Sequence, residues 1–275
     1  QGSGPSRRLP ARMEAEEADE AWRIALEEIY EDGGRSATCF SGLDDAELAL
    51  INSEAHGGKG AHVYGDTDAD LVAHLFELML GRPIARDADV FADLGSGSGK
   101  LALQMLTRTP SVVGIELSST RHQQAQFALA EARARGLLPE GSDVRLHCAS
   151  MLQHEASAAA NLVYCYGLAL SPTFLQTLEQ DLAARLPGGA LVLLRGNGFP
   201  AAPDAALQPR QGERRLQPVL ETKIVNRVHQ YYGYRVVESP AATSATDETR
   251  VVELEQRAQP LGATRFERLV FAAPE

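Results

Sequence analysis

The sequence predicts a doubly wound α/β fold, in which helices cover both faces of a mostly parallel, Rossmann-like sheet. Three observations predict it. Short apolar strands alternate with helical patterns from residue 70 to residue 195, three alternating glycines follow the first of these strands, and the chain closes with strand patterns that have little helix between them. Alternating strands and helices form right-handed βαβ units. The last strands fit an antiparallel hairpin at the sheet edge.

The elements follow in chain order. An amphipathic helix is expected over about residues 14–32, with apolar residues at helical spacing and a stop at Gly33-Gly34. A short helix over 44–51 and a glycine-containing loop over 52–61 come next. The alternation then predicts helices over 70–80, 99–108, 118–135 and 172–186, and strands over 89–94, 112–116, 143–148, 161–166 and 190–195.

The C-terminal part of the chain breaks this alternation. Residues 196–218 are rich in Pro, Ala, Gln and Gly, so we expect a long connection there. Strands are expected over 235–238, 250–254 and 265–272. We expect two units, namely a helical N-terminal segment with a lid-like loop (1–62) and the main domain (63–275).

Composition limits the classes of partner. The formal charge of -11 and pI near 5.2 argue against strong nucleic-acid binding by the chain itself, because such binding needs clustered Lys and Arg. The short basic cluster Arg210, Arg214 and Arg215 is interpreted as a solvated loop. No apolar stretch approaches the roughly 20 residues that span a bilayer, and no signal-peptide core is present, so an intracellular protein without a membrane partner is expected.

The three cysteines predict neither disulfides nor a metal site. Cys39, Cys148 and Cys165 are few and scattered, and none belongs to a C-x-x-C pair. We expect reduced thiols and no bound metal.

The stretch Ala92-Asp93-Leu94-Gly95-Ser96-Gly97-Ser98-Gly99-Lys100 predicts a ligand site at a strand–helix junction. Its spacing is G-x-G-x-G, and Asp93 stands two residues before the first glycine. A carboxylate beside a pyrophosphate would be unfavourable, whereas beside a ligand ammonium group it is favourable. A P-loop is excluded because Leu101 follows Lys100. Glu116, about 20 residues on at the next strand end, is placed to accept ribose hydroxyls.

A ribose, a cationic amino-acid end and no phosphate describe S-adenosylmethionine. The sequence therefore predicts this cofactor; the alternatives are a capping role for Asp93 and NAD binding. The residues assigned to it are Asp93, Gly95, Ser96, Gly97, Gly99, Lys100 and Glu116.

The segment Val63-Tyr64-Gly65-Asp66-Thr67-Asp68-Ala69-Asp70-Leu71-Val72 resembles the V-Y-G-E-T-x-x-D-L-V segment of the disruptor-of-telomeric-silencing (Dot-one-like, non-SET) histone lysine methyltransferases. The similarity continues through Asp93–Lys100 (D-L-G-S-G-x-G-Q in the family) and Gly114-Ile115-Glu116 (G-V-E). It covers residues 50–200, about half the chain. It implies a seven-stranded methyltransferase sheet with an antiparallel C-terminal hairpin.

The resemblance also implies further cofactor residues. Tyr64, Asp66 and Thr67 would lie over the methionine part of S-adenosylmethionine; the alternative for them is a helix-capping turn. Ser150 and Met151 stand where the family has an acid for the adenine amino group and a stacking aromatic. A hydroxyl and a thioether can replace these groups with weaker interactions.

The largest departure from the family is at the end of the fourth strand. The family has N-N-F-x-F there, and this chain has Tyr166-Gly167-Leu168-Ala169-Leu170. Tyr166 is expected to replace the polar wall of the acceptor channel, so Tyr166 and Tyr64 are the catalytic candidates. The basic nucleosome-binding flanks of the family are not evident.

Methyl transfer is an in-line displacement that depends mainly on alignment, and no residue stands out as a base. The leading hypothesis is protein-lysine N-methylation, with a histone as the candidate target, in an apolar channel lined by Leu168, Leu170 and Phe199 that favours the neutral amine. A histone target implies a nuclear protein, and otherwise a cytoplasmic one is expected. The alternatives are a small-molecule methyltransferase with residues 33–63 as a lid, and an inactive cofactor-binding subunit. The sequence leaves the oligomeric state open.

Overall fold

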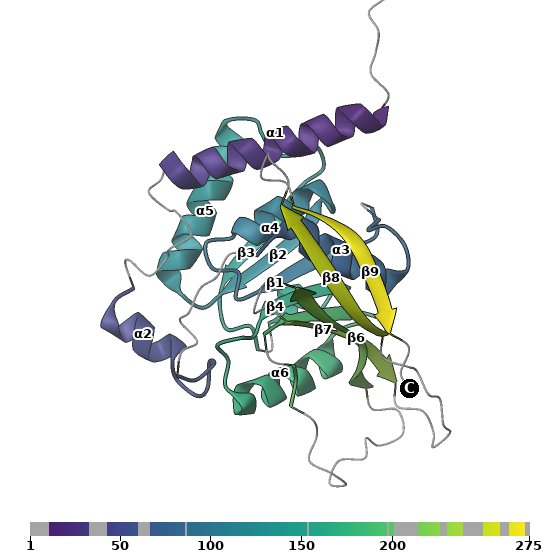
Figure 1. The fold of residues 1–275 in the computed structure, drawn as a ribbon. Helices are drawn as coiled ribbons and strands as arrows, with labels where there is room; N and C mark the ends of the chain where they lie inside the picture. Colours follow the sequence, from purple (N-terminus) through teal and green to yellow (C-terminus); the bar gives the residue numbers. More distant parts are fainter. Residues whose placement is uncertain are drawn as a thin grey trace, which may run out of the picture.

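The computed structural model is built around one nine-stranded sheet (Figure 1). It describes residues 11–32, 43–59, 67–85, 87–152, 154–196, 198–200, 214–225, 230–238, 250–258 and 264–272, and only the backbone of 11–18, 31–32, 223–225, 250–258 and 264–272. The strands are β1 (Val90–Leu94), β2 (Ser111–Glu116), β3 (Asp143–Cys148), β4 (Leu162–Tyr166), β5 (Leu191–Arg195), β6 (Arg214–Val225), β7 (Gln230–Glu238), β8 (Arg250–Ala258) and β9 (Thr264–Ala272). The helices are α1 (Ala11–Asp32), α2 (Asp45–Ile51), α3 (Ala69–Leu80), α4 (Lys100–Gln104), α5 (Ser119–Ala134) and α6 (Pro172–Arg185), with short 3-10 helices η1 (Met105–Thr107) and η2 (Glu155–Ser157).

The strand order is β3-β2-β1-β4-β5-β7-β6-β8-β9. Strands β1 to β5 pair in parallel, whereas β7 is antiparallel to both β5 and β6. The order reverses between β1 and β4, and open α/β sheets bind ligands at such a switch point, beyond the carboxyl ends of the strands. The predicted doubly wound α/β class, with mostly parallel strands and an antiparallel C-terminal pair, is confirmed.

Two features of the C-terminal part differ from the prediction. Seven strands, from β3 to β6 in sheet order, form the expected sheet, and the antiparallel hairpin β8–β9 extends it through a parallel pairing of β8 with β6. The long connection predicted over 196–218 is wrong for residues 214–218, which begin β6. The strand was missed because Pro218 argues against one, since a proline cannot donate a hydrogen bond to a neighbouring strand. In the structure, Pro218 lies at a register shift in the pairing of β6 with β7.

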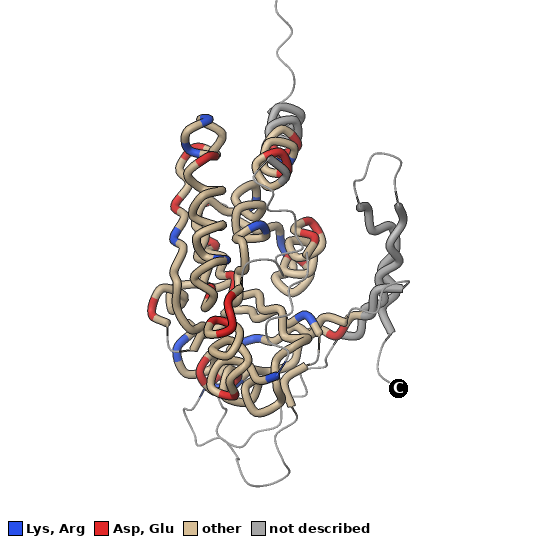
Figure 2. Tube along the Cα trace, turned by 90° about the vertical axis from the view of Figure 1, so that its left-hand side faces the viewer, with Lys and Arg blue, Asp and Glu red and all other residues tan. Residues whose placement is uncertain are grey.

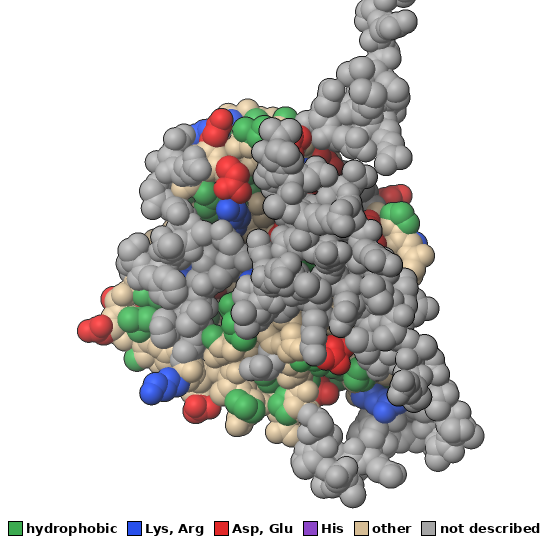
Figure 3. Space-filling model, viewed as in Figure 1, with side chains coloured by type: hydrophobic (Ala, Val, Ile, Leu, Met, Phe, Trp, Pro, Cys, Tyr) green, Lys and Arg blue, Asp and Glu red, His purple; other side chains and the backbone are tan. Residues whose placement is uncertain are grey.

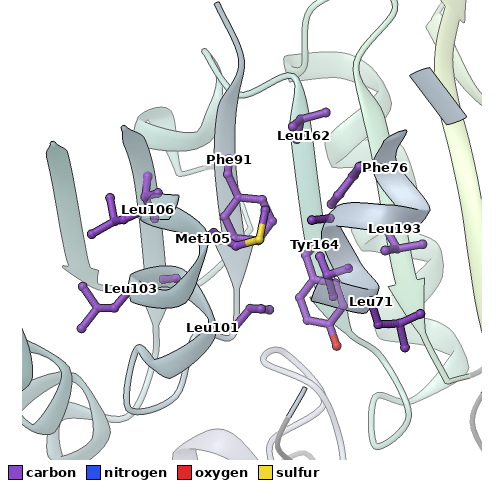
Figure 4. Close-up of a cluster of buried hydrophobic side chains, with 14 of the residues drawn as sticks. Leu71, Phe76, Phe91, Leu101, Leu103, Met105, Leu106, Leu162, Tyr164 and Leu193 are labelled. Carbon is purple, nitrogen blue, oxygen red and sulfur yellow. The ribbon is translucent and has the colours of Figure 1, made fainter. Parts of the chain in front are cut away.

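The two faces of the sheet carry separate hydrophobic clusters, since neighbouring strand residues point to opposite sides. Side chains of α1, α3, α4 and α5 cover one face, where Phe91 and Tyr164 are fully or almost fully buried (Figure 4). Helix α6 covers the other face through Phe174, Leu178 and Leu182. Helices on both faces leave the strand ends as the place for a site.

Side-chain caps fix where several helices begin. The Ser118 hydroxyl accepts a hydrogen bond from the Arg121 amide at 3.1 Å and starts α5. The Ser171 hydroxyl accepts from the Phe174 amide at 3.2 Å, and Pro172 follows it at the first position of α6. These are the residue types that helix N-termini favour.

Helix α1 is packed against the helix that follows the glycine turn. The Trp22 indole donates to the Leu103 carbonyl at 3.1 Å, and the Tyr30 hydroxyl donates to the Ser98 carbonyl at 2.7 Å. Leu26 and Ile29 are buried beside them. The N-terminal helix therefore shares a hydrophobic core with the sheet and is hydrogen-bonded to the glycine turn through Tyr30.

The basic residues do not form one continuous patch on the surfaces that are shown. Lys and Arg residues are spread along the described trace in Figure 2, and the basic side chains visible in Figure 3 lie apart from one another. Arg214 and Arg215 lie exposed at the start of β6, so the loop interpretation is wrong for these two; Arg210 lies outside the described residues. No helix in the described ranges combines the length and apolarity needed to cross a bilayer.

The buried carboxylate of Asp89 connects several segments at the amino end of β1, opposite the glycine turn. Asp89 is 1% exposed and accepts hydrogen bonds from both terminal nitrogens of Arg82 at 2.8 and 2.9 Å. It also accepts from the Ala85 amide at 2.6 Å and the Asn161 side chain at 2.8 Å. The hydrogen bonds from Arg82 lower the pKa of Asp89 most strongly.

We expect Asp89→Ala to lower the free energy of unfolding by about 2–4 kcal/mol at pH 7, because Arg82, the Ala85 amide and the Asn161 side chain lose a buried acceptor. Urea unfolding measures it. The folded pKa is depressed, so the contribution is present above the unfolded pKa of about 3.9 and is lost as the pH falls through the folded value. Asp87→Ala removes an exposed neighbouring carboxylate and is the matched control. Equal losses in the two variants would contradict this role.

Candidate functional site

Two buried carboxyl groups lie at the carboxyl ends of neighbouring strands. Asp93 is the fourth residue of β1 and Glu116 is the last residue of β2, and they are 3% and 5% exposed. The register pairs Asp93 with Gly114 and Leu94 with Ile115, so both side chains lie at one edge of the sheet. This edge adjoins the switch point between β1 and β4.

The glycine turn follows Asp93 and folds back on β2. Gly95 and Gly97 have φ values of 80° and 56°, which side chains other than that of glycine rarely allow. The amides of Gly95 and Ser96 donate to the Ile115 carbonyl at 2.8 and 3.0 Å. The spacing of the glycines is therefore required by the backbone itself as well as by any ligand.

Glu116 holds this turn through its carboxylate. One oxygen accepts from the Gly97 amide at 2.7 Å, and the other accepts from the Ser118 amide at 2.8 Å. Burial raises the pKa of Glu116, and the two amides and the charge of Arg121 oppose that rise. Each oxygen keeps one further lone pair, so the carboxylate can still accept two hydroxyl groups of a ligand.

Asp93 has a different environment. Burial, and then repulsion from Glu116, raise its pKa to about 8. At pH 7 the carboxyl group is therefore mostly protonated in the free protein. The sequence predicted an anionic wall here, and a cation bound beside Asp93 would favour that ionised form.

Three other predicted cofactor residues of the turn contact other parts of the chain. Lys100 forms an ion pair with Glu27 of α1 at 3.0 Å. A Cβ on Gly99 would stand 2.8 Å from Ala125 of α5, so Gly99 permits close packing of the turn against that helix. The Ser96 side chain lies beside Gly114. A direct cofactor contact by these three residues remains a prediction.

The predicted adenine residues follow β3 and reach the glycine turn. The terminal methyl carbon of Met151 lies 3.4 Å from the position of a Cβ on Gly95. The Ser150 hydroxyl accepts from the Leu152 amide at 3.3 Å, and the Ala149 amide donates to the Glu116 carbonyl at 2.9 Å. The structure thus brings this segment together with the turn and Glu116.

The segment before α3 is described only in part. Tyr64 and Asp66 lie outside the described residues. The Thr67 hydroxyl lies 2.8 Å from the Tyr164 hydroxyl and accepts from Arg195 at 2.8 Å. Asp68 is the residue that caps α3, through the Leu71 amide among others, so the capping interpretation is wrong for Thr67.

Tyr166 ends β4 and pairs with Arg195 of β5. The Arg195 guanidinium carbon lies 4.9 Å from the centroid of the Tyr166 ring. The sequence interpretation missed both Tyr164 and Arg195. A charged residue at the end of the apolar strand Leu191–Arg195 was the one signal that could have indicated Arg195.

The predicted apolar channel is only partly formed by the expected residues. Leu168 is 43% exposed beside Tyr166, whereas Leu170 is buried in the core under α6. Phe199 packs on the Tyr234 ring, with centroids 4.8 Å apart. The expectation that Leu170 lines an open channel is wrong, because its side chain fills the α6 side of the sheet.

Residues 44–59, called here the strap, cross the carboxyl ends of the strands from the α5 side to the α6 side. Near its start, Glu47 accepts from the Ser118 hydroxyl at 2.6 Å and from the amide and hydroxyl of Thr120 at 2.9 and 2.8 Å. Near its end, the Gly57 carbonyl accepts from the Ser171 amide at 2.7 Å. Since α5 follows β2 and α6 follows β4, the strap spans the carboxyl ends of β2, β1 and β4.

Cys148 and Cys165 are free thiols, and Cys39 lies outside the described residues. In the part of the chain that the structure describes, no three His, Cys, Asp or Glu side chains gather in a metal-binding arrangement.

No protein-family model and no curated protein matches the chain. Solved structures similar to it include an RNA methyltransferase from Salinibacter ruber in complex with S-adenosyl-L-homocysteine (21% identity, 67% of this chain and 99% of that chain, TM-score 0.40). Others are the putative methyltransferase yhhF from Escherichia coli (22%, 65% and 90%, 0.44) and the rRNA methyltransferase aviRa from Streptomyces viridochromogenes (16%, 70% and 93%, 0.43). At these identities and TM-scores, the fold assignment rests on the strand order, and no substrate is transferred.

We expect Asp93→Asn to stabilise the free protein at high pH. The folded pKa lies near 8 and the unfolded value near 3.9, so the free energy of unfolding of the wild type falls as the pH rises between them. The variant has no such loss and should be more stable by roughly 2–5 kcal/mol at pH 9, with a much smaller difference at pH 4.5. Urea unfolding at both pH values measures this. Asp143→Asn, which removes an exposed carboxyl on β3, should show no such trend. A wild type more stable than Asp93→Asn at pH 9 would contradict the raised pKa of Asp93.

Proposed function

We propose that this protein is an S-adenosylmethionine-dependent methyltransferase. The observation that carries the proposal is the buried pair Asp93 and Glu116 beside the Gly95–Gly99 turn, at the switch point of a doubly wound sheet. A nucleoside with a cationic amino-acid end matches this pair, because a cation would offset the repulsion between the two carboxyl groups.

The residues present fit this cofactor. The buried Asp93 would carry the charge opposite the ammonium group, and Glu116 would accept the ribose hydroxyls. Gly95 leaves room for close approach, since among the described residues beyond its chain neighbours only Met151 lies within 4 Å of a Cβ placed there. When bound, the cofactor supplies an electrophilic methyl group.

A phosphate-bearing ligand fits less well. Each phosphate would add negative charge beside two carboxyl groups whose pKa values are already raised by burial. Dinucleotide sites instead place the pyrophosphate at the glycine turn and a single acid on the ribose. The paired acids therefore favour a zwitterionic nucleoside over NAD.

Catalysis would depend on alignment. Tyr166 and Thr67 lie on neighbouring elements at this edge, and Tyr164 and Arg195 hold Thr67 in place. Side chains fixed in this way can orient an acceptor without transferring a proton themselves. We keep Tyr166 and Tyr64 as the catalytic candidates.

Two acceptor classes follow from different observations. The resemblance of residues 63–72 to the telomeric-silencing family supports a protein lysine, with a channel that diverges at Tyr166. The strap supports a small molecule instead, because it is attached on both sides of the strand ends and would enclose an acceptor. Residues 33–42 and 60–63 of the predicted lid lie outside the described residues.

We expect the wild-type protein to bind S-adenosylmethionine in titration calorimetry. Asp93→Asn should weaken that binding by about 10- to 100-fold, because it removes one charge-assisted interaction. The same variant should change adenosine binding by less than about 2-fold, because adenosine carries no cation.

Two results would contradict the proposal. One is the absence of binding up to millimolar S-adenosylmethionine, and the other is tighter binding of NAD than of S-adenosylmethionine. Asp143→Asn serves as the matched control, since it removes a carboxylate from the neighbouring strand β3 at an exposed position.

Incubation with methyl-labelled cofactor and cell extract separates the acceptor classes. Label in a protein band supports a protein lysine as acceptor, and label only in low-mass material supports a small-molecule acceptor. Cofactor binding without any transfer would indicate the inactive cofactor-binding subunit and overturn the proposed activity.

A further inference from the structure

The segment between β3 and β4 forms one side of the candidate site. The strand order β3-β2-β1 places Asp93, Glu116 and the end of β3 in a row. A nucleoside with its amino-acid end at Asp93 and its ribose at Glu116 therefore directs its base towards residues 149–152. Met151 already reaches the glycine turn from that side.

This segment has few strong side chains of its own. Ser150 and Met151 offer a hydroxyl and a thioether, and the hydroxyl already accepts from the Leu152 amide. Recognition of a base there depends on the position of the backbone amides and carbonyls, and a short connection holds such positions only if something outside fixes it.

Arg185, at the end of α6, supplies that support. Two of its five N–H donors go to Asp181, with the Nε and Nη2 atoms at 2.8 and 2.7 Å from the Oδ2 atom. The other three go to the segment: Nη2 to the Met151 carbonyl at 2.9 Å, Nη1 to the His154 carbonyl at 3.1 Å, and Nη1 to the Ser157 hydroxyl. All five donors of the guanidinium are thus used.

We infer that Arg185 is a positioning residue for the base-binding side of the cofactor site. It does not touch the ligand; it fixes the carbonyl of Met151, whose side chain contacts the glycine turn. The Arg185 side chain is 12% exposed and its partner Asp181 is 13% exposed, so water competes little for these contacts. The inference rests on the proposed function, because it assumes an adenosine moiety at Glu116.

Lysine cannot replace this residue. An ammonium group has three donors on one nitrogen, whereas the guanidinium reaches Asp181 on one side and Met151, His154 and Ser157 on the other. Arg185→Lys should therefore behave like Arg185→Met in binding, although it preserves the charge.

The matched control is Arg82→Met. Arg82 also spans a buried acid and a loop carbonyl, with hydrogen bonds to Asp89 and Pro83, but at the opposite edge of the sheet. A general loss of stability would affect both variants, whereas a loss of base positioning would affect only the Arg185 variants.

The test is titration calorimetry with adenosine and with S-adenosylmethionine, well below the unfolding temperature of each variant. Arg185→Met and Arg185→Lys should weaken both ligands by the same factor, about 10-fold, because both carry the base. Ser157→Ala, a milder change that removes one of the three contacts, should weaken both by about 3-fold. Arg82→Met should leave both affinities unchanged.

The outcomes separate the two claims. If the wild type binds both ligands, and Arg185→Met and Ser157→Ala bind them with unchanged affinity, the inference is overturned and the proposed function is not. Equal weakening in Arg82→Met also overturns the inference. Weakening of S-adenosylmethionine without weakening of adenosine also overturns it, because the effect would then lie at the amino-acid end. Wild-type protein that binds neither ligand overturns the proposed function, and this inference with it.

Discussion

The burial of two carboxyl groups side by side is the constraint on which the site depends. Glu116 is stabilised by the amides of Gly97 and Ser118, which also fix the glycine turn. Burial, and then repulsion from Glu116, raise the pKa of Asp93 to about 8, so the protonated form is favoured near neutral pH. Under the proposed function, a cation bound beside Asp93 would favour its ionised form, so cofactor binding would release a proton. Such a site would favour ligands that bring a positive charge without phosphates.

The surrounding elements hold this arrangement from three sides. Helix α1 holds the turn from behind through Tyr30, the strap attaches to the start of α5 through Glu47, and Arg185 holds the segment after β3. The N-terminal residues are thus part of the site as well as of the core. Because each support comes from a different part of the chain, the geometry at the strand ends depends on the folding of the whole sheet.

Much of the fold and part of the site could be predicted from the sequence. The strands up to β5 are short and apolar, and periodicity locates them well. The carboxyl ends of parallel strands meet at one edge, so Asp93, Glu116 and the glycines could be placed together from spacing alone. Strand β6 could not be recognised, because Pro218 and its polar neighbours read as a loop. The position of Leu170 could not be foreseen either, because it lies in the turn after β4, where no periodicity indicates which way a side chain points.

The remaining features depend on contacts between distant segments. The protonation of Asp93 follows from burial by elements that lie far apart in sequence, and the roles of Glu47 and Arg185 follow from partners 71 and 34 residues away. Neither residue belongs to a local motif. The methyl acceptor would be set by residues around Tyr166, where the chain departs from the family that it resembles. The resemblance favours a protein lysine as acceptor, whereas the strap favours a small molecule.

The most direct test of this account is the number of protons released when S-adenosylmethionine binds. Calorimetry at pH 6.5 in two buffers with different ionisation enthalpies gives that number. The account predicts about one proton released per cofactor bound by the wild type, because Asp93 ionises opposite the cation. It predicts a much smaller release by Asp93→Asn. Binding with the same heat in both buffers would show that Asp93 does not change its charge, and would contradict the central claim.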